Sequence, residues 1–144
     1  MLETIIHKRK LFAIILNEKR YKKRGIQFIT PNHFNIQVGF INHNKNYTII
    51  PHIHKNYLRK INKTSEVIFV KKGVLRVDFY NFKKKYLFSK ILKKNNIIIL
   101  IEGSHGFKVI KKCSLIEVKQ GPFKASLDKE KFKQVDEKKI RIKK

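Results

Sequence analysis

The stretch EVIFVKKGVLRVDFY, residues 66–80, indicates the fold class because apolar and polar residues alternate in its second half, from Leu75 to Tyr80. Alternation with a period of two is the pattern of a β-strand that buries one face. We therefore predict strands over residues 66–71 and 74–80, separated by a turn at KKG, residues 71–73. In the second strand, the side chains expected to point inward are Leu75, Val77 and Phe79, and those expected to point outward are Arg76, Asp78 and Tyr80.

Short β-branched and aromatic runs of the same kind occupy most of the chain, interrupted by Asn, Gly and Lys clusters. The further predicted strands cover residues 11–16, 26–29, 35–41, 47–54, 86–92, 97–101, 107–110 and 115–120. A strand about every ten residues is typical of all-β sandwiches and barrels. After residue 123 the sequence becomes mostly charged, and we expect a short helix or strap there, outside the core.

The length and composition favour one globular domain. The chain has 144 residues and 42% hydrophobic residues, enough for a substantial core. No apolar run exceeds six residues, whereas a membrane-spanning helix needs roughly 20, and the N-terminus does not resemble a signal peptide. We therefore expect a cytoplasmic protein without a membrane segment. The single cysteine, Cys113, lies in an apolar run and is expected to be a small core residue.

The formal net charge of +25 would fit a nucleic-acid partner, since clustered cations release counterions from phosphates. The basic residues, however, are 29 Lys and only 6 Arg, and they are spread along the whole chain. Arginine is the side chain that reads phosphates and bases in two-pronged geometry. The composition therefore favours a basic surface without nucleic-acid function, and nucleic acid stays the less favoured partner.

Within residues 66–80, Glu66 is the candidate functional residue. It shares a strand face with Ile68 and Val70, and a carboxylate there is costly unless it is paired or binds a metal ion. Upstream, His52 and His54 are two apart in a strand-like segment, so both imidazoles would point to the same side. Downstream, His105 follows the most apolar predicted strand.

Two motifs around these residues resemble those of the cupins, a family of small jelly-roll barrels. The first cupin motif, G-x5-H-x-H-x3-4-E-x6-G, corresponds to YTIIPHIH and EVIFVKKG, with Asn46 at the leading Gly position. The second, G-x5-P-x-G-x2-H-x3-N, corresponds to NIIILIEGSH, with Asn95 at its leading Gly position. Asn is the residue that best tolerates the left-handed backbone conformation of such a turn after Gly.

The resemblance covers about residues 35–120, and this chain departs from the motifs in several places. In the second motif, Ile101 replaces the Pro and the spacer from Gly103 to His105 is one residue short. Eleven residues separate His54 from Glu66 instead of three or four, which predicts an inserted loop at the barrel mouth. The final Asn position of the second motif is Val109. The closing segment IEVKQGPF is similar to small bacterial cupins of undefined activity, some of them associated with surface-polysaccharide biosynthesis.

The resemblance implies a fold and a ligand set. The fold would be an all-β jelly-roll barrel of two antiparallel sheets over residues 35–123, with N-terminal strands over 1–34 packing on it and a charged strap or tail over 124–144. One divalent transition metal ion would be bound by His52, His54, Glu66 and His105. Such ligands suit Fe, Mn, Ni, Zn or Cu without choosing among them.

The implied function is a metal-binding cupin that acts on a small polar or carbohydrate-like substrate. The metal would serve as a Lewis acid for an isomerase, epimerase or dioxygenase reaction. Tyr57, Arg59 and Gln120 are the candidate substrate contacts. The alternative is a non-catalytic module that binds a small ligand or a metal. Because cupins commonly pair through their sheets, we also expect a homodimer, with the apolar segment KLFAIILN as a strand available for pairing.

Overall fold

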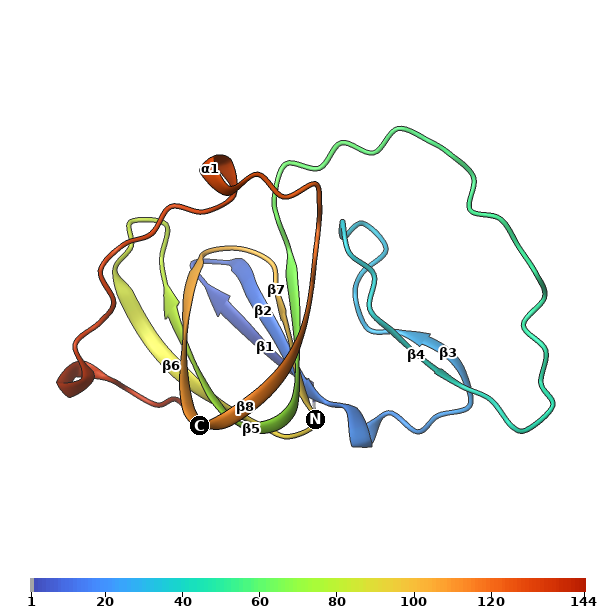
Figure 1. Ribbon diagram of the computed structural model, residues 1–144, viewed down its shortest axis with the longest axis horizontal. Helices are drawn as coiled ribbons and strands as arrows, with labels where there is room; N and C mark the ends of the chain where they lie inside the picture. Colours follow the sequence, from blue (N-terminus) through green and yellow to red (C-terminus); the bar gives the residue numbers. More distant parts are fainter. Residues whose placement is uncertain (1) are drawn as a thin grey trace.

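The computed structural model describes residues 2–144 and has an all-β architecture of two antiparallel sheets (Figure 1). The strands are β1 Glu3–His7, β2 Lys10–Asn17, β3 Gly25–Phe28, β4 Gly39–Asn42, β5 Glu66–Tyr80, β6 Tyr86–Lys93, β7 Asn96–Leu100 and β8 Ser104–Lys119. The helical segments are short: η1 Glu18–Arg20, α1 Ala125–Asp128 and η2 Glu137–Lys139. The fold class predicted from the sequence is thus confirmed at the level of all-β.

The larger sheet is organised around β5. β8 pairs with β5 along its length, while the opposite edge of β5 pairs first with β7, from Glu66 to Phe69, and then with β6, from Val74 to Tyr80. The sheet continues from β7 through β2 to β1, and β3 pairs with β4 in a separate hairpin. The two sheets are not closed into a barrel.

A bend in the middle of β5 lets this sheet curve around its own core. Gly73 has φ +96°, and the pairing with β8 shifts register on both sides of it. A Cβ atom at Gly73 would lie 2.2 Å from the carbonyl oxygen of Lys112, so only glycine fits this point. The turn predicted at residues 71–73 is therefore a bend within one strand, because β8 stays paired across it. Likewise, the predicted strands 107–110 and 115–120 belong to the single strand β8.

The core lies inside the curve of the sheet. Leu75, Val77 and Phe79 are fully buried there, as the alternation predicts, beside residues from β2 and β7. A second apolar cluster covers the other face of β2 and β7, where the β3–β4 hairpin and its connections pack. That cluster is centred on Ile14, Leu16 and Ile99. β2 lies between β1 and β7, so both edges of the segment KLFAIILN are paired within the chain.

The outward face of β5 is covered by the last part of the chain. Arg76, Asp78 and Tyr80 do point away from the core, but they are buried, each with 5% exposure or less. Residues 129–144, which we name the C-terminal strap, run along this side of the sheet, where Ser89 forms an isolated bridge with Ile142 (Figure 1). The predicted outward direction of these three side chains is thus confirmed, but their burial was not predicted, because the alternation of one strand carries no information about a distant segment that covers it.

Residues 44–64 form a long exposed loop that swings away from the sheet (Figure 1, cyan to green). The strand predicted over 47–54 is not formed, because this segment lies beside no strand with which it could exchange backbone hydrogen bonds. Its apolar residues are left in solvent, with Ile53 87% and Leu58 97% exposed. We call residues 44–64 the exposed loop.

Both Asn residues at the leading Gly positions of the motifs adopt the left-handed conformation. The φ angle is 67° at Asn46 and 69° at Asn95. Asn95 forms the tight β6–β7 connection, and its backbone N–H donates to the carbonyl of Val70. The conformation expected from the sequence is confirmed at both positions.

Candidate functional site

A carboxylate and an imidazole meet at the end of the curved sheet. His105 Nε2 donates a hydrogen bond to Glu66 Oε2 over 3.0 Å. The backbone explains the contact: Glu66 pairs with Leu100 at the end of β7, and β8 begins four residues later, after the turn at Gly103. Gly103 has φ +78° and lies against the Phe12 ring, where a Cβ atom would be 2.5 Å from the nearest ring carbon.

The surroundings of Glu66 keep its carboxylate ionised. The hydrogen bond from His105 lowers the pKa of Glu66 below its ordinary value, and this outweighs the opposing effect of burial. The positive charges of Lys129 and Lys119 lower the pKa further, with Lys129 Nζ 4.0 Å from Glu66 Oε1. An ionised, 7% exposed carboxylate beside an imidazole is a pair of donors that a cation could use together.

The two other predicted ligands are not brought to this pair. His52 and His54 lie on the exposed loop, with their ring centroids 5.2 Å apart, and His52 Nδ1 is 3.0 Å from the carbonyl oxygen of Ile50. Among residues 2–144, no three His, Cys, Asp or Glu side chains are grouped so that they could hold one metal ion. The structure therefore brings Glu66 and His105 together and leaves His52 and His54 on a separate segment.

The predicted substrate contacts are divided in the same way. Tyr57 and Arg59 are on the exposed loop, where the guanidinium carbon of Arg59 lies 3.6 Å from the centroid of the Tyr57 ring. Gln120 instead lies beside the start of β5, where its Oε1 accepts a hydrogen bond from the backbone N–H of Ser65 over 2.6 Å. Its Nε2 is buried, and no hydrogen-bond acceptor in the described part of the chain contacts it.

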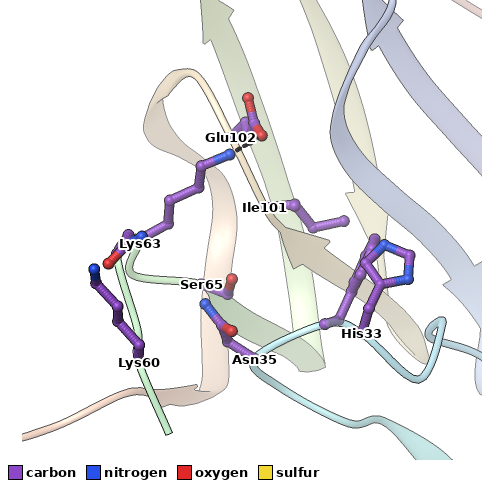
Figure 2. Close-up of a pocket in the computed structure, with 9 residues that line it drawn as sticks. His33, Asn35, Lys60, Lys63, Ser65, Ile101 and Glu102 are labelled. Atoms are coloured by element: carbon purple, nitrogen blue, oxygen red, sulfur yellow. Dashed lines mark hydrogen bonds and ion pairs between the residues drawn. The ribbon is translucent and has the colours of Figure 1, made fainter.

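A polar cavity of about 280 Å³ lies where the exposed loop returns to the sheet, and its lining does not include Glu66 or His105 (Figure 2). Figure 2 shows Lys63 reaching Glu102, with Lys60, Asn35 and Ser65 around them. Lys10 is also near this carboxylate, with Nζ 3.9 Å from Glu102 Oε2. The lining suits a small polar ligand, and Ser65 is the lining residue that precedes Glu66 in the chain.

A partly buried ion-pair network joins the C-terminal strap to β5. Arg76 donates to Asp78 over 2.8 and 3.0 Å and to Glu137 over 2.7 and 2.9 Å. Lys108 Nζ is 2.9 Å from Glu137, and the hydrogen bonds from Arg76 and Lys108 lower the pKa of Glu137 to about 2. The same network raises the pKa of Arg76 above its ordinary value, so both groups stay charged.

Sequence reasoning missed this network and the lysine beside Glu66. Arg76 and Asp78 have the alternation of solvent-facing residues, and Lys129 is one of many lysines in a charged segment. The signal that could have indicated the network is the run DEKK, residues 136–139, which places two of the chain's ten acidic residues side by side after a basic stretch.

Comparisons with protein-family models, with curated proteins and with solved structures gave no match for this chain. The resemblance to cupins therefore stays a prediction that is based on the motifs alone. In the described part of the chain, every helix is too short or too polar to cross a membrane.

Proposed function

We propose that this chain is a cupin-type metal-binding protein, in which Glu66 and His105 form the fixed half of the site. The observation that supports this most strongly is their 3.0 Å contact at the open end of the sheet. His52 and His54 supply the second half when residues 47–54 pair with β8 and complete the jelly-roll barrel. The ligand set is then three imidazoles and one carboxylate.

The length of the chain allows this arrangement. Eleven residues lie between His54 and Glu66, and an extended chain covers about 3.3–3.6 Å per residue, so the tether does not keep the histidines from the pair. The residues are also chemically suited, because a metal ion binds neutral imidazole nitrogen and ionised carboxylate oxygen at about 2.0–2.2 Å. Glu66 is held ionised by its neighbours. His105 would turn its Nε2 from Glu66 to the ion.

The bound ion would be one divalent transition metal, Fe, Mn, Ni, Zn or Cu. It would supply Lewis acidity at the one or two coordination positions that the protein leaves open. The polar cavity lined by Lys60, Lys63 and Asn35 would take up a small polar or carbohydrate-like substrate. An isomerase, epimerase or dioxygenase reaction fits this combination of an ion and a polar cavity.

Elemental analysis of protein purified without a histidine tag tests the metal site. We expect about one transition-metal ion per chain, as a single mononuclear site requires. The double variant His52→Ala/His54→Ala and the double variant Glu66→Gln/His105→Ala should each lose the metal. His33→Ala is the matched control for metal content, since this histidine is exposed and is not one of the four proposed ligands. Wild-type protein without metal, or equal metal in all variants, would overturn the proposal.

The second candidate is a module that binds a metal or small ligand without catalysis. Two carboxylates outside the proposed ligand set favour it, because they are already engaged. Glu102 is paired with Lys63, and Asp78 is buried with Arg76 and Ser89. A general acid or base would then have to come from outside these groups. Tight binding of a sugar phosphate that is recovered unchanged after long incubation would favour the module over the enzyme.

A further inference from the structure

The outer edge of β8 is an unused pairing surface. β8 has 16 residues and pairs only with β5 in the described part of the chain, so its other edge exposes backbone N–H and C=O groups. Its exposed apolar side chains are Phe107, Val109, Ile110, Leu115, Ile116 and Val118. A long, apolar edge strand of this kind is a template for a strand from another segment or another chain.

The exposed loop carries a segment suited to that edge. Residues 47–54 show little alternation of apolar and polar residues, but they are rich in β-branched residues. Ile49, Ile50 and Ile53 are all exposed. Within one chain this segment lies apart from β8 (Figure 1). The same molecule therefore contains an unpaired strand edge and an unpaired strand-forming segment.

The starting point of the loop directs the segment away from its own site. The loop leaves β4, and the β3–β4 hairpin packs on the face of β2 and β7 that carries Ile14, Leu16 and Ile99. Glu66 lies on the opposite face, in the row that includes Ile68 and Val70 of the core. The segment leaves on one face of the sheet while its proposed ligand partners lie on the other.

We propose that two copies of this chain exchange residues 47–54, each segment adding a strand to the β8 edge of the other copy. The exchange is symmetric, so one contact buries the apolar edge and the apolar loop of both copies. Where the proposed metal function holds, each ion is then bound by Glu66 and His105 of one copy and by His52 and His54 of the second copy. The metal site lies at the interface and is incomplete in a single chain.

The charge of the chain opposes this association and makes it sensitive to salt. Lys108, Lys111 and Lys112 lie on β8, and Lys45 and Lys55 flank the exchanged segment. Repulsion between like charges is screened beyond about 8 Å at physiological ionic strength. The dimer should therefore become more stable as salt rises, opposite to an interface held by ion pairs.

Light scattering on the full chain tests the exchange without reference to metal. We expect a dimer for the wild type and a monomer for Ile50→Lys/Ile53→Lys, whose side chains are exposed in the single chain, so that the fold does not depend on them. Leu58→Lys/Ile61→Lys is the control, since it adds the same two charges at exposed positions outside the exchanged segment and should stay dimeric. A monomeric wild type, or a dimeric Ile50→Lys/Ile53→Lys, overturns the proposal.

Co-expression of two metal-deficient variants tests the shared site. One variant is His52→Ala/His54→Ala and the other is Glu66→Gln/His105→Ala, each with a different tag that contains no histidine. An exchanged heterodimer has one complete site and should bind about half the metal of the wild-type dimer, while each variant alone binds none. Metal in the wild type without restoration in the heterodimer overturns the exchange but leaves the proposed function. A wild-type dimer without metal overturns the proposed function but leaves the exchange.

Discussion

The C-terminal strap and the exposed loop are both irregular and rich in lysine, yet only the strap is held against the sheet. The strap has partners at intervals along its length. The Tyr80 hydroxyl accepts the N–H of Val135, Arg76 binds Glu137, and Ser89 exchanges backbone hydrogen bonds with Arg141 and Lys143. Phe132 also packs edge-on against the Tyr80 ring.

The exposed loop has apolar side chains but few such contacts. Its contacts outside itself include the ion pair of Lys63 with Glu102, at its very end, and the stacking of Tyr47 on His43, at its start. The difference teaches that specific polar partners fix an irregular segment, whereas apolar side chains alone need a complementary surface. In the proposed dimer, the outer edge of β8 is that surface. Variants in the strap and in the exposed loop should differ accordingly, and the expected differences run from the largest to the smallest.

The largest effect is expected from removing the arginine that holds the strap. Arg76→Ala leaves the buried Asp78 carboxylate without its main partner and also frees Glu137. Breaking a buried ion pair in this way costs about 3–5 kcal/mol of the free energy of unfolding. Urea denaturation should show this loss. Arg59→Ala, in the exposed loop, is the control and should change the stability by less than about 0.5 kcal/mol. Equal losses of the free energy of unfolding in Arg76→Ala and Arg59→Ala would contradict the difference between the strap and the exposed loop.

Limited digestion with trypsin compares the two segments in one sample. Both contain many lysines, but the exposed loop needs no opening before cleavage. We expect cuts after Lys55, Arg59 and Lys60 to precede cuts in the strap by about tenfold or more in rate. The Ile50→Lys/Ile53→Lys monomer gives the comparison without association. Cleavage of its strap at the same rate would show that the strap is not held.

Acid should weaken the strap more than the loop, because residues 44–64 contain no Asp or Glu and the loop's ion pair with Glu102 involves only Lys63, at its very end. The pKa of Glu137 is lowered to about 2 in the folded chain, below its ordinary value. Its contribution is therefore complete above the ordinary pKa of the carboxyl and is lost as the pH falls toward 2. The urea midpoint should fall less between pH 6 and pH 3 in Glu137→Gln than in the wild type. An identical decline would show that Glu137 is not linked to folding.

The smallest effect is expected where the strap is exposed to solvent, at Glu130. Lys84 pairs with Glu130, whose side chain is 77% exposed, and such surface pairs contribute about 0–1 kcal/mol. Glu130→Gln should therefore lower the free energy of unfolding by less than 1 kcal/mol. Lys55→Gln, in the exposed loop, is its counterpart. If Glu130→Gln lowered the free energy of unfolding as much as Arg76→Ala does, the exposed Lys84–Glu130 pair, and not the Arg76 network, would hold the strap.

The sequence predicted what depends on local pattern. Alternation identified the strands and placed Leu75, Val77 and Phe79 in the core, and the face shared by Glu66 and Ile68 singled out the carboxylate that the structure pairs with His105. The left-handed conformations of Asn46 and Asn95 followed from the residue type.

The sequence did not predict what depends on distant segments. The burial of Arg76 and Asp78 requires a strap that begins more than 50 residues later. The strand predicted over 47–54 has the right residues but no neighbour in one chain, because strand formation requires a partner for the backbone as well as a propensity. Pattern alone could not supply that partner.

Amide hydrogen exchange of residues 47–54 tests most directly whether this segment adds to β8 and delivers its histidines. In the metal-loaded wild type, we expect the amides of residues 47–54 and of the outer edge of β8 to exchange more slowly than in the metal-free wild type. Both regions should slow together, by about tenfold or more. His52→Ala/His54→Ala treated with the same metal should lose that metal-dependent part of the protection. Rapid exchange of residues 47–54 in wild-type protein that binds one metal ion per chain would contradict the account.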